Sequence, residues 1–237
     1  MAPLSIAAAF LILLSLAAGV YWLFFLTEGA YLGERVVVWL YDLYARRYDA
    51  IKEWDVQDEI EYLAEPFAAA VGDRRQPRIL DVAAGTGRLT LALELSGLLS
   101  DAQWILLDAS KKMLARARER LGENPRLHYV RGTGQALPFP NASFDVVTCL
   151  EALEFMPDPE AALDELIRVL RPGGLLFITN RTGPGAKWLP GRVWSHNQVF
   201  QHLKARGMTH ISIRPFLVDY EWVTAVKKSY HLPLAAA

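Results

Sequence analysis

The sequence predicts an α/β fold with a mostly parallel seven-stranded sheet and helices on both faces, preceded by one transmembrane helix. Three observations indicate this fold class. Short apolar runs alternate with longer amphipathic stretches from residue 55 onward, a glycine-rich turn follows the first of these runs, and residues 4–26 carry no charged side chain. Strands that alternate with helices form mostly parallel sheets covered on both faces. The 237 residues suffice for one such domain with a small appendage, but not for two of ordinary size.

The first element is an uncharged segment of 23 residues, 4–26. As a helix rising about 1.5 Å per residue it would be about 35 Å long, enough for a hydrocarbon core of about 30 Å. Tyr21 and Trp22 stand near its end, where interfacial aromatic residues are common. A cleaved signal peptide is the alternative, but it would begin with basic residues and have an apolar run of about 7–15 residues. We therefore expect residues 1–27 to be a retained transmembrane anchor.

Charged residues near the anchor predict its orientation. No Lys or Arg precedes the uncharged segment, whereas Arg35, Arg46, Arg47 and Lys52 follow it. Because basic residues favour the cytoplasmic side, we expect a single-pass protein of the cell membrane with its main domain in the cytoplasm. The net charge of −1 excludes a strong basic field of the kind that attracts nucleic acid. A single cysteine, Cys149, excludes an internal disulfide and a cysteine-based zinc site.

Residues 28–54 form a second unit, which we predict to be an amphipathic linker or lid helix. Its apolar residues between positions 29 and 50 fall mostly three or four positions apart, with charged residues between them. Such a helix can lie on the membrane surface or pack on the main domain, and the pattern fits both arrangements.

Apolar periodicity also predicts the secondary structure of the main domain, residues 55–230. Strands are expected at residues 78–82, 104–108, 127–130, 144–150, 175–179, 211–218 and 221–227. Helices are expected at residues 55–71, 88–99, 111–121, 158–170 and 197–206. Ser110 is a predicted N-cap and Gly122 a predicted helix end. The Arg-Pro-Gly-Gly run at 171–174 is expected to stop a helix, and residues 231–237 to be a tail.

Ligands of such sheets bind at the carboxyl ends of the strands. Residues 81–87 follow the first strand, and glycines there let the backbone turn tightly and approach a ligand. The helix that follows offers free N–H groups at its start. Asp108 ends the second strand, where a carboxylate can accept hydrogen bonds from two ribose hydroxyls. These two features fit a dinucleotide-binding dehydrogenase as well, and a glycine turn can be purely structural.

Further motifs distinguish between these possibilities. The chain resembles the class I S-adenosylmethionine (SAM)-dependent methyltransferases, in the broad group of small-molecule and lipid-quinone enzymes. The residues that carry the resemblance are the motif at 79–87, the loop at 132–139, the strand at 144–147, the turn at 170–174 and the tyrosine-rich segment at 41–49. The resemblance implies a Rossmann-like sheet and SAM as the cofactor.

The resemblance also implies roles for individual residues. Asp81 and the turn through Gly87 would hold the amino-acid end of SAM, and Asp108 its ribose hydroxyls. Family members usually carry Asp where this chain has Thr133, so adenine recognition would rest on Thr133, Gln135 or the backbone. The complete predicted cofactor-binding set is Asp81, Ala83, Ala84, Gly85, Thr86, Gly87, Asp108, Ala109, Met113, Thr133, Gly134, Gln135 and Leu150.

The segment after the fourth strand, residues 149–159, is similar to ubiquinone-type O-methyltransferases. In that group a Glu-x-x-Glu-His run can bind a divalent metal, and here Phe155 replaces the histidine. Two carboxylates without a third ligand make a poor closed site, so no metal is predicted. Oxygen nucleophiles need deprotonation. The candidate catalytic residues near the transfer point are Tyr48, Glu151, Glu154 and His196.

The acceptor is predicted to be hydrophobic or lipid-like. A membrane anchor keeps the domain near lipids, and residues 181–196 resemble a loop over the acceptor, with Trp188 and Trp194 suited to an apolar molecule. The predicted function is therefore a membrane-anchored SAM-dependent methyltransferase with its catalytic domain in the cytoplasm, acting on an oxygen, nitrogen or sulfur nucleophile. The alternatives are a non-catalytic SAM-binding membrane protein and an NAD-dependent oxidoreductase.

Overall fold

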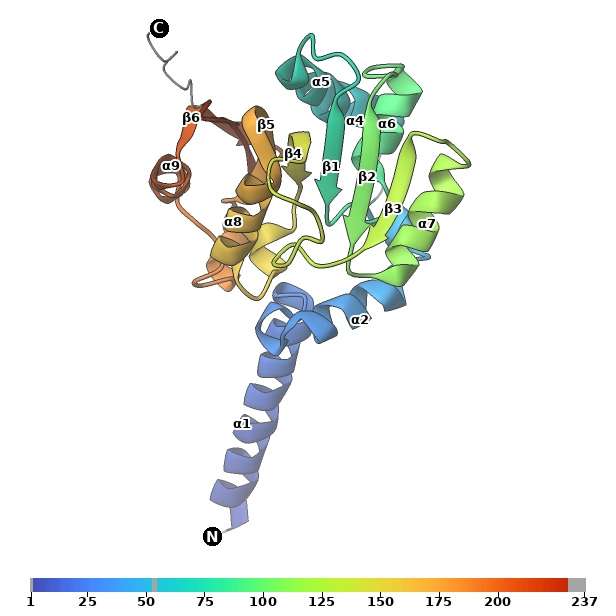
Figure 1. Cartoon of the computed structure of the whole chain (residues 1–237). Coiled ribbons are helices and arrows are strands. Elements are labelled where there is room, and N and C mark those ends of the chain that lie inside the picture. Colours follow the sequence, from blue (N-terminus) through green and yellow to red (C-terminus); the bar gives the residue numbers. More distant parts are fainter. Residues whose placement is uncertain (1, 53–54, 230–237) are drawn as a thin grey trace, which may run out of the picture.

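The computed structural model describes residues 2–52 and 55–229 and shows an α/β fold from which the N-terminal helix projects (Figure 1). Its seven strands form one sheet in the order β3-β2-β1-β4-β5-β7-β6. Their bounds are β1 Arg78–Val82, β2 Gln103–Asp108, β3 Leu127–Arg131, β4 Phe144–Cys149, β5 Leu170–Arg181, β6 Met208–Phe216 and β7 Tyr220–Lys227. Strands β1 to β5 pair in parallel, whereas β7 pairs antiparallel with β5 and β6. The predicted mostly parallel sheet is confirmed, and the sheet is mixed.

The central strands are apolar on both faces because helices cover both. Successive side chains of a strand point to opposite faces, so Leu80 and Ile105 pack into one core cluster and Ile79 and Trp104 into the other. The first cluster is closed by α8 (Pro159–Val169) and α9 (His196–Ala205), and the second by α5 (Glu65–Val71), α6 (Arg88–Ser96) and α7 (Lys111–Leu121).

Helix ends follow local chemistry. The Ser110 side chain accepts a hydrogen bond from the Met113 N–H at 3.0 Å, and Gly122 caps the other end of α7, as predicted. The predicted helix at 88–99 is wrong at its end, because Gly97 adopts a left-handed φ of +71° and stops α6 at Ser96. Helix α8 ends at Val169, so the predicted helix stop before residues 171–174 is confirmed. These residues extend β5, whose pairing with β4 is irregular between Leu170 and Leu175.

Other boundaries differ by small amounts. The predicted helix at 55–71 is divided into α4 (Val56–Glu59), a π-helical turn η3 (Ile60–Ala64) and α5. Strand β6 begins at Met208, three residues before its predicted start. The predicted tail at 231–237, and positions 53–54 of the predicted linker, lie outside the described residues.

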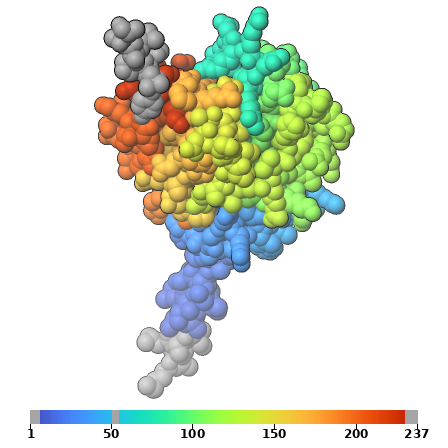
Figure 2. All heavy atoms as spheres, in the orientation of Figure 1, coloured from blue at the N-terminus to red at the C-terminus, as the bar shows by residue number. Residues whose placement is uncertain are grey.

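The N-terminal region leaves the domain at the carboxyl ends of the strands. Helix α1 (Ala2–Tyr21) continues into a π-helical turn, η1 (Trp22–Leu26), and stands clear of the domain (Figures 1 and 2). Residues 7–26 are long and apolar enough to cross a membrane and none of them is buried, although a signal sequence would share these properties. After a short turn η2 (Ala30–Leu32), helix α2 (Glu34–Tyr44) lies crosswise beneath the strand ends, and α3 (Tyr48–Lys52) follows.

Candidate active site

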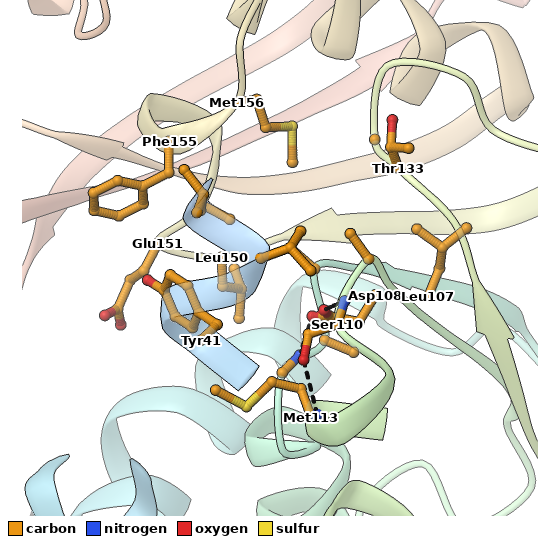
Figure 3. A pocket seen from close by; sticks show the side chains of 18 of the residues that line it. Tyr41, Leu107, Asp108, Ser110, Met113, Thr133, Leu150, Glu151, Phe155 and Met156 are labelled. Carbon is orange, nitrogen blue, oxygen red and sulfur yellow. Dashed lines mark hydrogen bonds between the residues drawn. The ribbon is translucent and has the colours of Figure 1, made fainter. Parts of the chain in front are cut away.

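A cavity lies where the strands β1, β2 and β4 end, and it is closed by the N-terminal region (Figure 3). We call its two sides the floor and the roof. The floor is formed by residues within the ranges 81–89, 107–113, 132–134 and 150–157, and the roof by Glu34, Val37, Val38, Tyr41 and Tyr48. Carboxyl ends of parallel strands are where such sheets bind ligands, so the cavity is in the expected place.

The glycine turn leaves the floor open for a ligand. Gly85 has a φ of +55°, and a Cβ added to it would have no atom within 4 Å, so its backbone faces open space. Gly87 serves packing instead, because a Cβ there would come within 2.8 Å of the Leu121 side chain. Glycine therefore serves a different purpose at each position. Gly85 leaves room for a ligand to approach the backbone, and Gly87 leaves room for α7.

Two carboxyl groups lie side by side in the floor. Asp108 accepts hydrogen bonds from the N–H groups of Gly85 at 2.8 Å and Ser110 at 2.7 Å, and burial raises its pKa to about 6. Burial, with the charge of Asp108, raises the pKa of Asp81 to about 8. Within the described part of the chain Asp81 has no hydrogen-bond partner. Buried carboxylates of this kind favour a cationic ligand and disfavour the pyrophosphate of a dinucleotide.

Side-chain hydrogen bonds hold the roof to the floor. Asp42 of α2 accepts from the Ser110 hydroxyl and from the Lys112 N–H at the start of α7. Asp49 of α3 accepts from the Thr86 hydroxyl at 2.7 Å and from Arg120 at 2.8 Å. The roof is thus attached to the glycine turn and to the helix after β2, the elements that carry Gly85 and Asp108.

Comparison with known proteins assigns the domain. Residues 80–178 match the family described as a methyltransferase domain. A demethylmenaquinone methyltransferase from Clavibacter sepedonicus is 42% identical over 107 residues, 45% of this chain and 42% of that protein. The UbiE ubiquinone/menaquinone biosynthesis C-methyltransferase of Azotobacter vinelandii is 35% identical over 144 residues, 59% of this chain and 56% of its own. The chain therefore spans about half the length of these curated relatives.

A solved structure agrees with this assignment at the level of the fold. A SAM-dependent methyltransferase from Aquifex aeolicus superposes with a TM-score of 0.60 at 19% identity, covering 78% of this chain and 97% of its own. Residues 80–178 form a SAM-dependent methyltransferase domain.

Most of the predicted cofactor residues of the methyltransferase domain line the cavity. Those that do are Asp81, Ala83, Ala84, Gly85, Thr86, Asp108, Ala109, Met113, Thr133, Gly134 and Leu150. Gly87 packs on α7, and Gln135 lies outside the lining, with its N–H donated to the Thr133 hydroxyl at 3.2 Å. Sequence analysis missed the roof residues Val37, Val38 and Tyr41, although the amphipathic pattern at 29–50 held the signal for them.

The four candidate catalytic residues are not all brought together. Tyr48 and Glu151 line the cavity, and Glu151 pairs with Arg88 at 2.6 Å. Burial raises the pKa of the Tyr48 hydroxyl well above its ordinary value, and the charge of Glu151 raises it further. His196 lies away from the cavity with its side chain 63% exposed, paired with Glu221 at 3.1 Å.

Glu154 is buried behind the cavity wall and accepts a hydrogen bond from the Tyr220 hydroxyl at 2.7 Å. Burial raises its pKa to about 7, although Tyr220 and Arg181 oppose the shift. In the described ranges, no group of three His, Cys, Asp or Glu side chains is placed to hold a metal ion. Glu151 and Glu154 are instead held by protein partners.

The segment at 181–196, predicted as a loop over the acceptor, packs against the base of the N-terminal helix. Leu189 is buried with Ala30 and Phe155 in a small apolar cluster. Arg192 donates to the carbonyl oxygens of Met156 and Ala30. This segment therefore joins the N-terminal region to the end of the floor that carries Phe155 and Met156.

Proposed function

We propose that the protein is a membrane-anchored methyltransferase that transfers the methyl group of SAM to a hydrophobic, quinone-like aromatic acceptor. The observation that supports the proposal is a difference in polarity between the two ends of the cavity. One end has the carboxyl groups of Asp81 and Asp108, and the other has the apolar side chains of Phe155 and Met156 next to the base of α1.

The carboxylate end suits SAM. When bound, SAM supplies an electrophilic methyl group on a positively charged sulfur. The Asp81 carboxyl group faces the cavity with no hydrogen bond in the described residues, and burial favours its protonated form. A cationic amino-acid end would favour the ionised form and lower this pKa. Asp108 would accept the ribose hydroxyls, and the open backbone at Gly85 would allow close approach. Asp81, which lies at the start of the glycine turn, argues against NAD, whose anionic pyrophosphate would lie at that turn.

The apolar end suits the ring of a quinol. The related proteins from Clavibacter and Azotobacter carry menaquinone or ubiquinone in their names, and the second is named a C-methyltransferase. Carbon therefore joins the oxygen, nitrogen and sulfur nucleophiles considered from the sequence. A phenolic ring becomes nucleophilic when its hydroxyl is deprotonated. Glu151 is the proposed proton acceptor, and Tyr48, whose raised pKa keeps it protonated, is a proposed hydrogen-bond donor that orients the acceptor.

The anchor accounts for access to such an acceptor. Residues 7–26 would span the bilayer, and the basic residues after them would hold the domain on the cytoplasmic side, where SAM is made. The protein would thus keep its cavity close to acceptors that do not leave the membrane.

The test uses the full chain reconstituted in phosphatidylcholine vesicles with radiolabelled SAM. We expect label to move to a prenylated naphthoquinol in the bilayer, and we expect an Asp108→Ala variant to transfer far less at a SAM concentration near the dissociation constant of the unchanged protein. Calorimetry on the same preparation should show binding of SAM and not of NAD. SAM binding without transfer to this quinol or to any extracted lipid would indicate the alternative, a non-catalytic SAM-binding protein.

A further inference from the structure

We propose that the domain docks flat on the bilayer through a second contact beyond α1, so that the acceptor enters the cavity from the lipid side. This proposal rests on the proposed function in one respect, that α1 anchors the protein in the bilayer. The docking face consists of exposed side chains from three segments: Leu32, Trp39, Leu43 and Tyr44 around α2; Lys187 and Trp188 in the short helix η5 (Pro184–Trp188); and Leu217 and Val218 in the β6–β7 turn.

These segments are far apart in sequence but meet around the base of α1. Helix η5 lies against η1, the continuation of α1. The β6–β7 turn lies next to η5, because the N–H groups of Thr182 and Gly183 donate to the Asp219 carbonyl at 2.8 and 3.3 Å. Helix α2 extends from the same base, crosswise to α1 (Figure 1). A bilayer crossed by α1 would therefore meet all three segments at one level.

The composition of the face is that of a membrane interface. Outside α1 and η1, the remaining exposed large hydrophobic side chains of the described residues are Val56, Tyr62, Leu95 and Phe200, which lie on other elements. The docking face also carries Arg35, Arg46, Arg47 and Lys187, all exposed. Among the acidic residues near it, Asp42 accepts hydrogen bonds from Ser110 and Lys112 at the start of α7, so its carboxylate is directed toward the domain. Exposed aromatic and basic residues together favour an anionic lipid surface.

The β6–β7 turn has a conformation that supports the same conclusion. Leu217 has a φ of +51° and is 56% exposed, and Val218 is 87% exposed. Hairpin turns that need a positive φ usually carry Asn, Asp or Gly, because a larger side chain is strained there. A leucine at this point is therefore unfavourable both for the backbone and for contact with water. Insertion into lipid would remove the unfavourable contact of the leucine side chain with water.

Docking at this face would set the route of the acceptor. The inner side of α2 gives Val37, Val38 and Tyr41 to the cavity, and its outer side gives Trp39 and Leu43 to the docking face. A single helix, about 10–12 Å across, would then separate the cavity from the headgroups. A quinol with a long tail could place its ring in the cavity while its tail stays in the bilayer.

Single-cysteine labelling tests the docking face in the full chain. Cys149 is buried and burial raises its pKa well above the ordinary value, so an introduced exposed cysteine can be labelled selectively. A fluorophore is placed at Leu43→Cys or Val218→Cys, with Leu95→Cys and Phe200→Cys as matched exposed controls and Leu16→Cys as a reporter of the anchor. The probe is a vesicle of phosphatidylcholine and phosphatidylglycerol that carries nitroxide-labelled acyl chains, which quench nearby fluorophores.

We expect strong quenching at positions 16, 43 and 218 and none at positions 95 and 200. Quenching at position 16 alone would overturn the docking face and leave the anchor intact. Quenching at positions 43 and 218 without position 16 would support docking and refute the anchor. Methyl transfer measured on the unlabelled protein decides the proposed function separately.

A Leu217→Asn variant gives a second test. Asparagine tolerates the left-handed backbone, so we expect the melting temperature to stay the same or rise. Turnover of a bilayer-embedded quinol should fall several-fold, whereas a Phe200→Gln variant, which changes an exposed apolar residue elsewhere, should keep it. Equal turnover by Leu217→Asn and the unchanged protein, together with unquenched labels, would contradict the proposal.

Discussion

The floor and the roof of the cavity come from different parts of the chain and are held in different ways. The floor is formed by strand ends within or next to residues 80–178, and its Asp81 and Asp108 stand on strands with neighbours on both sides. The roof is a short helical segment before the matched region, attached through Asp42 and Asp49. The comparison teaches that the residues proposed to hold the cofactor lie in the matched domain, whereas residues that cover the cavity lie in the N-terminal segment of this chain.

The largest expected effect is loss of SAM binding on blocking the floor. A Gly85→Val side chain would occupy the open space in front of the turn and would be strained at a φ of +55°. We expect no SAM binding by calorimetry. Gly97→Val is the matched control, because Gly97 has a φ of +71° and equally open surroundings at the end of α6. If both variants lose similar stability and both still bind SAM, the turn is structural only.

Removing the floor carboxylate should weaken binding without abolishing the site. Asp108→Ala loses the acceptor of the proposed ribose hydrogen bonds, and hydrogen bonds to a charged group contribute about 1.5–3 kcal/mol. SAM affinity should therefore fall about 10- to 150-fold in a folded protein, measured by calorimetry. Asp101→Ala, which removes a carboxylate bonded only to the Gln76 N–H in the described structure, should leave the affinity unchanged.

The same carboxylate predicts a pH dependence. Burial raises the pKa of Asp108 from 3.8 to about 6, so a proton on this group favours the folded protein, and this stability is lost as pH rises through 6. Binding has the opposite sign, because the ionised form accepts both hydroxyl hydrogen bonds. Asp81, with a pKa of about 8, gives a fall in SAM affinity below pH 8 that should remain in the Asp108→Ala variant. The further fall below pH 6, about tenfold per pH unit, comes from Asp108 and should be absent from that variant.

Loosening the roof should have a smaller effect than altering the floor. Asp49→Ala removes the acceptor for the Thr86 hydroxyl and a partner of Arg116 and Arg120, so α3 would be held less firmly over the turn. We expect SAM release to be about tenfold faster by stopped flow, on the scale of one charged hydrogen bond. Glu119→Ala is the control, since Glu119 pairs with Arg116 at the surface, 67% exposed. Unchanged release would mean that the roof does not retain the cofactor.

The same contrast explains what the sequence could predict. The strands follow from apolar periodicity, and the N-cap at Ser110 follows from its residue type. The places of the carboxylates follow from the strand ends, so all three can be predicted locally. His196 lies outside the cavity lining because it pairs with Glu221 on β7, a contact that nothing local in the sequence shows. Gln135 lies outside the lining because its backbone turns back onto Thr133. Contacts between distant segments, such as Asp49 with Thr86, depend on how the roof packs, which no single stretch of sequence determines.

The smallest expected effect is that of removing divalent metal. Phe155, which replaces the histidine expected in a Glu-x-x-Glu-His run, is buried in an apolar cluster with Ala30 and Leu189. Glu151 pairs with Arg88 at 2.6 Å, and Glu154 accepts from Tyr220 at 2.7 Å. A pKa of about 7 leaves Glu154 about half protonated at neutral pH, and a protonated carboxyl is a poor metal ligand. We therefore expect methyl transfer to persist after exhaustive EDTA treatment, measured with radiolabelled SAM. Loss on chelation followed by recovery with Mg²⁺ would contradict this prediction. It would mean that Glu151 and Glu154 leave their protein partners to bind metal.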